Sequence, residues 1–256
     1  TGKEIEGCFV ACPLTAQQVL QLPTQTVYNK IVKTGRLAHS LGARILGLGA
    51  FTAVVGDGGM TVARRLGMPV TTGRSLTVAS AVEALKQAVN YRGIRLESAT
   101  VAVVGATGSI GSACAKMIAP LAGGLILVSR QESRLAQEQA RIKAAGARRV
   151  RASTQVEDII EADLVLSATS AAKPIIQPRH LKKGAIVCDV ALPSDVSPQV
   201  EQERDDVLLI EGGILELPGE VDFNFDFGLP PGRAYACMAE TMVLALEGRY
   251  ESYSLG

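Results

Sequence analysis

The sequence predicts an α/β protein of two domains, the second of them a doubly wound parallel sheet. Two observations carry this prediction. From Ile94 onward, short apolar segments alternate with segments of helical character, which is the order of a parallel sheet with crossover helices. The apolar segments are also nearly continuous, as expected of strands that are buried on both faces. A glycine-rich turn follows the first of them, at residues 105–111.

Composition limits the classes of protein that fit. The chain has 256 residues, of which 47% are hydrophobic, enough for one large domain or two small ones. A net charge of +1 gives no reason to expect nucleic acid or an anionic membrane as partner. No apolar run is long enough to span a membrane, and the first residues do not resemble a signal peptide. Five scattered cysteines and two histidines predict reduced thiols in a cytoplasmic protein and no metal site.

The first domain, expected over residues 1–92, is an α/β substrate domain. Its elements are predicted in the order strand, helix, strand, helix and connecting helix. The ranges are 5–12 for a strand, 15–41 for a helix with a potential break at Pro23, 43–56 for one or two strands, a short helix after Gly59, an extended segment over 69–73, and a helix over 75–91.

The second domain, expected over residues 93–233, is Rossmann-like. Strands are predicted at 100–104, 125–129, 149–152, 163–169, 185–191 and 207–213, with helices at 109–121, 132–145 and 155–161. A C-terminal segment, residues 234–256, is expected to form a helix over 235–247. This helix would return to the cleft between the domains.

The glycine-rich turn predicts a dinucleotide site. Gly105 permits a sharp turn, Gly108 lets the backbone approach a pyrophosphate, and Gly111 lets the helix pack closely on its strand. The free N–H groups at the start of that helix would face the anion. The predicted contacts from this turn are Gly105, Thr107, Gly108, Ser109, Ile110 and Gly111.

The end of the second strand selects between the two nicotinamide dinucleotides. Ser129 and Arg130 offer a hydroxyl and a guanidinium where NAD-binding proteins usually carry an acid, so NADP(H) is predicted. The alternative is that Arg130 merely begins a solvated helix. The nicotinamide half is expected to contact small residues that follow two further strands, namely Ala168, Thr169, Ser170, Val190 and Ala191. Asp189 is either a functional carboxylate or a residue that orients the backbone.

Cys237 is the candidate catalytic residue. The helix is expected to begin near Arg233 or Ala234, which would put the thiol in its first turn. The helix dipole and Arg233 would then lower the pKa of the thiol, and a thiolate beside a nicotinamide suggests thioester chemistry. The alternative is a buried cysteine on an apolar helix.

At these residues the chain resembles the cyanobacterial long-chain acyl-[acyl-carrier-protein] reductases and related bacterial dehydrogenases. The matching motifs are residues 1–3, 48–52, 71–73, 99–113, 235–240, 242 and 247–248. The resemblance implies that Cys237 is the acylated nucleophile and that NADPH supplies a hydride, with a fatty aldehyde as product. The partners it implies are an acyl thioester, on acyl carrier protein or CoA, and an aldehyde-consuming enzyme. Leu76 stands where those enzymes carry a histidine.

Two other functions stay open. One is an NADP-dependent dehydrogenase of a small amino or hydroxy acid, of the shikimate dehydrogenase type, in which Lys30 or Lys33 would be the base and Cys237 would only pack. The other is a non-catalytic NADP-binding protein. For acid–base chemistry at a thioester, the candidates are His39, Tyr235 and Glu240, each of which is more often structural.

Overall fold

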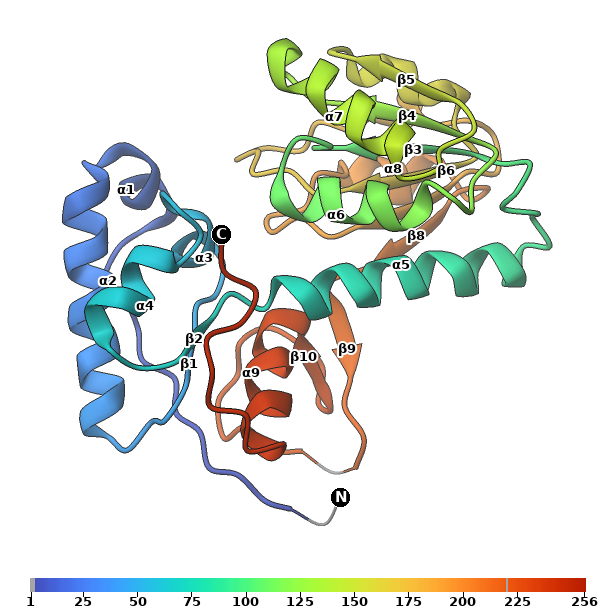
Figure 1. The fold of residues 1–256 in the computed structure, drawn as a ribbon. Coiled ribbons are helices and arrows are strands. Elements are labelled where there is room, and N and C mark those ends of the chain that lie inside the picture. The colour runs from blue at the N-terminus through green and yellow to red at the C-terminus, as the bar shows by residue number, and fades with distance from the viewer. Residues whose placement is uncertain (1–2, 220) are drawn as a thin grey trace. The chain divides into compact units, whose positions relative to one another are not determined.

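The computed structural model describes residues 3–219 and 221–256, and its chain contacts divide it into two units (Figure 1). Unit 1 comprises residues 1–76 and 215–256, and unit 2 comprises residues 77–214. The predicted boundaries at residues 92 and 233 differ from these. Most of helix α5 (Arg74–Tyr91) belongs to unit 2, because Val78, Val82 and Leu85 pack in its core.

Unit 2 is built on a six-stranded parallel sheet. Its strands are β3 (Thr100–Val104), β4 (Gly124–Val128), β5 (Val150–Ser153), β6 (Leu164–Ser167), β7 (Ile186–Asp189) and β8 (Leu208–Glu211). They are arranged in the order β5-β4-β3-β6-β7-β8, and every neighbouring pair is parallel. The strand order therefore reverses between β3 and β6, where doubly wound sheets bind their ligands. The predicted α/β fold with a Rossmann-like sheet is confirmed.

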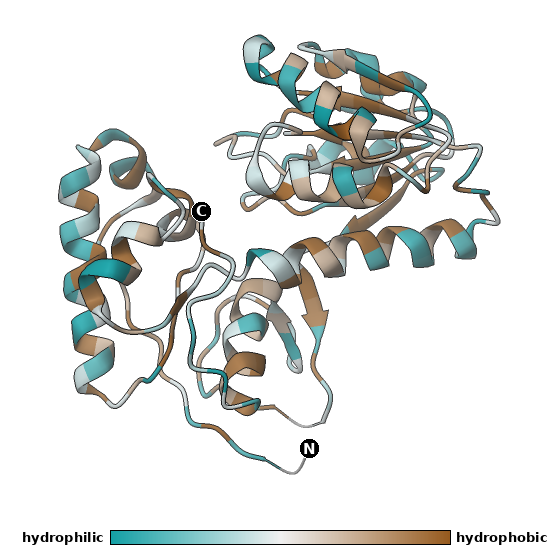
Figure 2. Cartoon of the chain, viewed as in Figure 1, coloured by the Kyte–Doolittle hydropathy of each residue, from teal (hydrophilic) through white to brown (hydrophobic). Residues whose placement is uncertain are grey.

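Both faces of this sheet are covered. Alternate residues such as Val101 and Val103 face one apolar cluster, with α5, α6 (Ser109–Ile118) and α7 (Glu132–Ala144). The residues between them, such as Ala102 and Val104, face a second cluster. That side is closed by η1 (Val156–Glu161), η2 (Pro178–His180) and α8 (Pro198–Glu203). The strands are accordingly brown in Figure 2, which explains why their sequences lack an alternating polar pattern.

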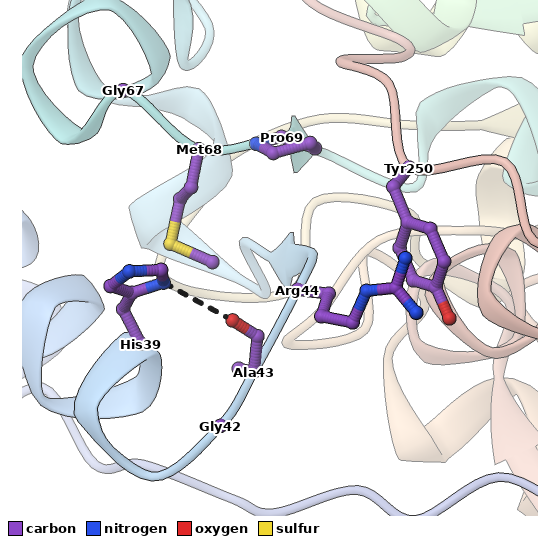
Figure 3. Close-up of a pocket in the computed structure, with 8 residues that line it drawn as sticks. All are labelled: His39, Gly42, Ala43, Arg44, Gly67, Met68, Pro69 and Tyr250. Atoms are coloured by element: carbon purple, nitrogen blue, oxygen red, sulfur yellow. Dashed lines mark hydrogen bonds between the residues drawn. The ribbon is translucent and has the colours of Figure 1, made fainter.

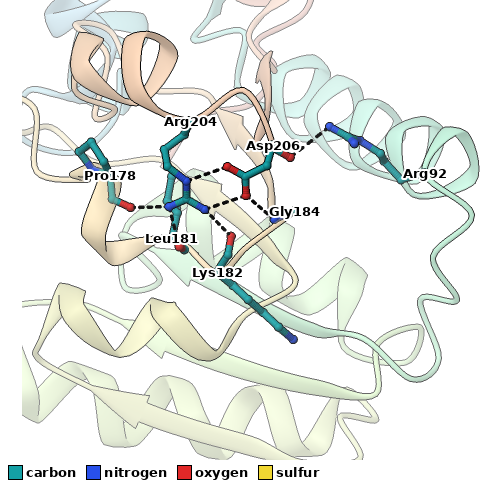
Figure 4. A network of polar contacts seen from close by, with 7 residues as sticks. All are labelled: Arg92, Pro178, Leu181, Lys182, Gly184, Arg204 and Asp206. Atoms are coloured by element: carbon teal, nitrogen blue, oxygen red, sulfur yellow. Dashed lines mark hydrogen bonds and ion pairs between the residues drawn. The ribbon is translucent and has the colours of Figure 1, made fainter.

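One arginine holds together the loops beside β7 and β8 (Figure 4). The Arg204 guanidinium pairs with Asp206, its Nε lying 2.8 Å from Oδ1. The Asp206 carboxylate also accepts the Gly184 N–H at 2.7 Å. The remaining guanidinium N–H groups donate to the backbone carbonyls of Pro178, Leu181 and Lys182. One planar cation thereby joins three backbone carbonyls to Asp206, which fixes the connection around η2.

The described residues of unit 1 form two two-stranded sheets and one apolar cluster. Its elements are α1 (Ala16–Gln21), α2 (Thr24–Ser40), β1 (Leu46–Gly47), α3 (Phe51–Val54), α4 (Met60–Leu66), β2 (Val70–Thr71), β9 (Ile214–Glu216), β10 (Arg233–Tyr235) and α9 (Ala236–Leu246). β1 pairs with β2 in parallel, and β9 pairs with β10. Val27 and Ile31 of α2, Val62 of α4 and Val70 of β2 meet in the core.

Several predictions for this unit are wrong. Residues 5–12 form no strand, because most of them are exposed and no neighbouring strand pairs with them. Residues 43–56 contain only the two-residue β1, and Phe51 begins the helix α3. Helix α9 begins at Ala236, after strand β10, and not at Arg233. The break at Pro23 is confirmed, since α1 and α2 lie on either side of it.

Candidate functional site

The turn between β3 and α6 requires its glycines. Gly105 has φ +84°, and a Cβ there would overlap the carbonyl oxygen of Ala168. A Cβ at Gly111 would overlap the carbonyl oxygen of Gly105, and one at Gly108 would lie 3.2 Å from that same oxygen. Helix α6 begins at Ser109, and no side chain caps it. This geometry leaves the first N–H groups of α6 available to an anion.

Two hydroxyls meet beside this turn. Thr107 Oγ1 lies 2.5 Å from Ser129 Oγ, which joins the glycine turn to the end of β4. Arg130 follows as an exposed residue, and no ion pair of the described residues uses it. Ser109 and Ile110 are the first two residues of α6. The structure thus brings together the predicted contacts of the turn and of β4, and it leaves the Arg130 cation uncompensated.

Asp195 organises the segment after β6, and it was missed from the sequence. Its fully buried carboxylate accepts the Ser167 hydroxyl at 2.6 Å, the Thr169 N–H at 2.9 Å and the Thr169 hydroxyl. Ala168 donates its N–H to the Val104 carbonyl at 3.0 Å. Ala168 and Thr169 are therefore fixed beside the glycine turn, whereas Ser170 is exposed. The sequence does not reveal this role, because Asp195 is 26 residues away from its partner Thr169 and no spacing rule relates the two.

Asp189 orients the backbone that follows β7. Its carboxylate accepts the Ala191 N–H at 3.0 Å, the Ser194 hydroxyl at 2.6 Å and the Asp195 N–H at 2.9 Å. Burial raises its pKa, while the hydrogen bond from Ser194 acts in the opposite direction. Val190 donates its N–H to the Ser167 carbonyl at 2.8 Å. The structure favours the orienting role for Asp189, and it places Val190 and Ala191 at the same edge of the sheet as Thr169.

Cys237 lies at the start of α9 in unit 1, half-buried beneath a tight turn. Gly73 has φ +70°, and a Cβ there would overlap Cα and Cβ of Cys237. The backbone at Gly73 therefore passes directly over the cysteine. The backbone N–H groups of Met238, Ala50 and Cys237 itself act to lower the pKa of the thiol.

The predicted lowering of the Cys237 pKa is wrong. Burial raises the pKa of this thiol, and its three backbone hydrogen bonds offset that effect only in part. The Glu240 carboxylate raises the pKa further. Arg233 belongs to the exposed end of β10 and is not among the groups that shift the thiol's pKa. The thiol thus has hydrogen-bond donors in place for a negative charge but is mostly protonated at neutral pH.

Glu240 anchors the turn that covers the cysteine. It is 4% exposed, and it accepts the Thr71 hydroxyl and, at 2.8 Å, the Leu76 N–H. Thr71 Oγ1 in turn accepts the Gly73 N–H at 3.1 Å. One carboxylate on α9 therefore fixes both ends of the 71–76 segment over the thiol. The sequence singled out Glu240 only as an acid–base candidate and gave no sign of this anchoring.

Ala50 is the unexpected member of this site. Its φ of +46° and ψ of −131° lie outside the regions that alanine normally occupies. The residue precedes α3 and presents its N–H to the Cys237 sulfur. Backbone strain of this kind costs about 1–3 kcal/mol and concentrates at functional sites. The sequence at residues 48–52 predicts a strand, whereas the structure places the start of α3 there.

The remaining candidates lie elsewhere in unit 1. His39 lines an open pocket of about 400 Å³ with Met68 and Tyr250, and its Nδ1 lies 3.3 Å from the Ala43 carbonyl (Figure 3). The Arg44 guanidinium lies 3.7 Å from the centre of the Tyr250 ring. The ring of Tyr235 contacts that of Phe227.

Three further observations concern the first matching motif, metal binding and membrane crossing. Of the motif at residues 1–3, Thr1 and Gly2 lie outside the described residues, and Lys3 donates to the Leu246 carbonyl at 3.4 Å. In the described part of the chain, no three His, Cys, Asp or Glu residues gather in a way that could hold a metal ion. Nor does any described helix have the length and apolar character needed to cross a membrane.

Comparisons with known proteins extend over the whole chain. It is 33% identical to aminotransferase PigE of Serratia sp. over all of its length, but it spans only 30% of that protein. It is 29% identical to the long-chain acyl-[acyl-carrier-protein] reductase of Synechococcus elongatus, again over all of its length and over 75% of that relative. The resemblance to acyl-[acyl-carrier-protein] reductases is thereby confirmed.

Two solved structures match parts of the chain. Glutamyl-tRNA reductase from Methanopyrus kandleri matches with a TM-score of 0.42 and 20% identity, over 73% of this chain and 46% of that one. Quinate dehydrogenase from Corynebacterium glutamicum, in complex with NAD, matches with a TM-score of 0.42 and 23% identity, over 52% of this chain and 50% of that one.

The family model for shikimate/quinate 5-dehydrogenases matches residues 84–211, half of the chain. That range covers the six-stranded sheet, the glycine turn and the segments after β4, β6 and β7. The fold and the family agree with the predicted nicotinamide dinucleotide cofactor. The chain therefore belongs to the shikimate/quinate 5-dehydrogenase family of oxidoreductases, and unit 2 has an NAD(P)-binding fold.

Proposed function

We propose that this protein reduces an acyl thioester to an aldehyde through an acyl group carried on Cys237, with NADPH as reductant. The observation that carries the proposal is the thiol at the start of α9, which lies under the turn at Gly73 and beside backbone N–H groups that act to lower its pKa. Such N–H groups favour the thiolate form that a cysteine nucleophile requires. The likeness to the Synechococcus elongatus reductase supports the same chemistry.

The chain's own residues would act first on the thioester. The Cys237 thiolate attacks the carbonyl carbon, the bond from that carbon to the carrier sulfur breaks, and the carrier leaves as a thiol after taking up a proton. The backbone N–H groups of Ala50, Cys237 and Met238, which act to lower the pKa of this thiol, would stabilise negative charge on the sulfur during this exchange. Because burial raises the pKa of the thiol, acyl transfer should become faster as pH rises.

The residues of unit 2 fit the cofactor. The N–H groups at the start of α6 would hold the pyrophosphate, and Ser129 with the unpaired Arg130 would hold a 2′-phosphate. The fixed segments at Ala168–Thr169 and Val190–Ala191 would line the nicotinamide half. A nicotinamide held there would supply the hydride to the acyl carbon. Release of the aldehyde then requires that the bond from that carbon to the Cys237 sulfur break, which returns the cysteine as its thiol. A reaction that consumes a reactive aldehyde must follow in the cell.

Intact-mass spectrometry tests the first step without cofactor. Incubation with acyl-CoA or acyl carrier protein thioesters should give a stoichiometric acyl adduct that is absent in Cys237→Ser. Added NADPH should then discharge the adduct with release of aldehyde. A lack of adduct at every chain length, with full activity of Cys237→Ala on a hydroxy acid, would overturn the proposal.

The second candidate is a dehydrogenase of a small hydroxy or amino acid. The family match over residues 84–211 favours it. Such chemistry needs a general base, and the predicted bases Lys30 and Lys33 are both exposed on α2. If the protein binds the cofactor but turns over neither class of substrate, the result would support a non-catalytic NADP-binding protein.

A further inference from the structure

The net charge of the chain hides a strong local imbalance. Between residues 7 and 76 the sequence holds seven Lys and Arg residues but a single acid, Asp57. The Asp57 carboxylate is already occupied, since it accepts the Tyr28 hydroxyl at 3.1 Å and the Thr61 hydroxyl at 2.6 Å. No free carboxylate within this segment is therefore available to neutralise its Lys and Arg side chains.

Most of these cations lie on two helices that pack together. We define the basic face as six exposed residues that take part in none of the ion pairs of the described chain. They are Lys30, Lys33, Arg36, Arg44, Arg64 and Arg65. Arg65 of α4 donates to Asn29 of α2 at 3.1 Å, which brings the cations of the two helices together. Figure 1 shows α2 and α4 side by side.

Helical spacing sets the outer side of α2. Its buried residues are Val27, Tyr28, Ile31, Val32, Gly35 and Ala38. At 100° per residue, Lys30, Lys33 and Arg36 point away from that buried arc and neighbour one another at spacings of three. The two colours along α2 in Figure 2 reflect these two sides. The stripe from Lys30 to Arg36 is about 9 Å long, which exceeds what one phosphate group occupies.

Two exposed leucines follow this stripe toward the end of α2. Leu37, which is 52% exposed, is four residues after Lys33, and Leu41, which is 63% exposed, is four residues after Leu37. An apolar side chain next to cations suits the surface of an acidic protein, in which an apolar contact is flanked by carboxylates. Single-stranded nucleic acid is instead held by aromatic stacking, and Tyr28, the only aromatic residue of α2, is buried.

The buried side of α2 packs in the same apolar cluster as the segment next to the Cys237 thiol. Val27 and Tyr28 share their apolar cluster with Ala53 of α3 and with Phe51. Phe51 follows Ala50, whose N–H group holds the Cys237 sulfur. A protein docked on the outer side of α2 would thus be separated by this one apolar cluster from the segment next to the thiol.

We propose that the basic face docks an acidic carrier protein that presents the acyl thioester to Cys237. This inference rests on the proposed function, and it names acyl carrier protein rather than CoA as the carrier. Charge complementarity on the rim of an interface acts mainly on the association rate. The reaction with carrier-borne thioester should therefore weaken as ionic strength rises, and that with a small thioester should not.

The test compares two charge-reversal variants of equal net charge. Lys30→Glu/Lys33→Glu/Arg36→Glu changes the basic face, and Arg134→Glu/Lys143→Glu/Lys183→Glu changes exposed cations of unit 2. Binding is measured by the fluorescence anisotropy of labelled acyl carrier protein. Acylation of Cys237 is followed by intact mass, with acyl carrier protein thioester and with an N-acetylcysteamine thioester.

The first variant should bind the carrier at least about tenfold more weakly and react correspondingly more slowly with its thioester. Its reaction with the small thioester and its thermal unfolding should stay at wild-type values, and the second variant should match wild type throughout. Equal carrier binding by all three proteins would overturn the proposal. So would an absence of carrier binding by wild type, or binding of anionic vesicles or oligouridylate that carrier does not displace.

The anisotropy measurement separates this proposal from the proposed function. Carrier binding that depends on the basic face, without any acyl adduct on Cys237, would retain the docking surface and remove the thioester chemistry. An acyl adduct that forms from both thioesters at rates independent of the basic face would retain the thioester chemistry and remove the docking surface.

Discussion

The two units of this protein build their sites by different means. Unit 2 forms its candidate cofactor site largely from backbone, with glycines where a Cβ would overlap a carbonyl oxygen and a helix start that no side chain caps. Unit 1 forms its candidate thiol site from side chains and turns that lie far apart in the chain, held by the buried Glu240. The first kind of site follows from local geometry, and the second depends on tertiary packing.

This difference has a consequence for substitution. Unit 2 surrounds its sheet with two apolar clusters, so its strands hold their ends in place even when one contact is lost. The turn over Cys237 depends instead on one carboxylate and on the absence of a side chain at Gly73. The thiol site should therefore be the more sensitive of the two to single changes.

The largest effect is expected from Gly73→Ala. The new methyl group would overlap Cα and Cβ of Cys237, and φ of +70° disfavours alanine. Displacement of the turn should slow acylation of Cys237 by about 100-fold, as measured by intact mass against time. Gly67→Ala is the matched control, because Gly67 has φ +65° but open space around the added Cβ. Equal acylation rates in both variants would remove the close contact as a requirement.

A smaller effect is expected from Arg130→Asp in unit 2. The change removes a charge-assisted hydrogen bond to a 2′-phosphate, worth about 1.5–3 kcal/mol, and introduces a repelling carboxylate. The affinity for NADPH, measured by fluorescence titration, should fall by at least about tenfold, with little change for NADH. Arg134→Asp on α7 should bind both like wild type. An equal loss of affinity for NADPH and NADH would show that Arg130 does not select between the two cofactors.

The smallest effect is expected from Glu240→Gln, and it concerns pH. The Glu240 carboxylate raises the Cys237 pKa, because a nearby negative charge disfavours the thiolate. Loss of that charge should lower the thiol pKa and move the pH profile of iodoacetamide alkylation toward lower pH. Glutamine keeps an acceptor oxygen for Thr71 or Leu76, so the turn is retained in part. Glu247→Gln, at the exposed end of α9, should leave the profile unchanged. A shift toward higher pH would contradict the assigned interaction.

The sequence was informative where structure follows from local signals. Gly105 and the apolar run before it predicted the turn, the strand and the helix, and Pro23 predicted the break between α1 and α2. The apolar residues at 5–12 carried the same signal as a strand but have no neighbour to pair with. Ala50 gave no warning, because nothing in alanine's chemistry indicates a positive φ.

The sequence also does not predict the hydrogen-bond partners of the Asp195 and Glu240 carboxylates. Asp195 and Thr169 are separated by 26 residues, and Glu240 and Thr71 by 169. No spacing rule along the chain relates such pairs, since each forms only when distant elements pack. The direction of the Cys237 pKa shift failed for the same reason, because it depends on burial that the local sequence does not determine.

The contact between Gly73 and Cys237 also has a meaning for biosynthesis. A ribosome makes Ala50 and Gly73 early and Cys237 late, with the whole six-stranded sheet encoded between them. Domains generally fold as units during synthesis, so the sheet has its complete sequence before α9 has been translated. The N–H groups of Ala50 and Met238 and the turn at Gly73 can surround the sulfur only after α9 has emerged. A nascent chain therefore cannot assemble the surroundings of this thiol until the last part of the sequence has been translated.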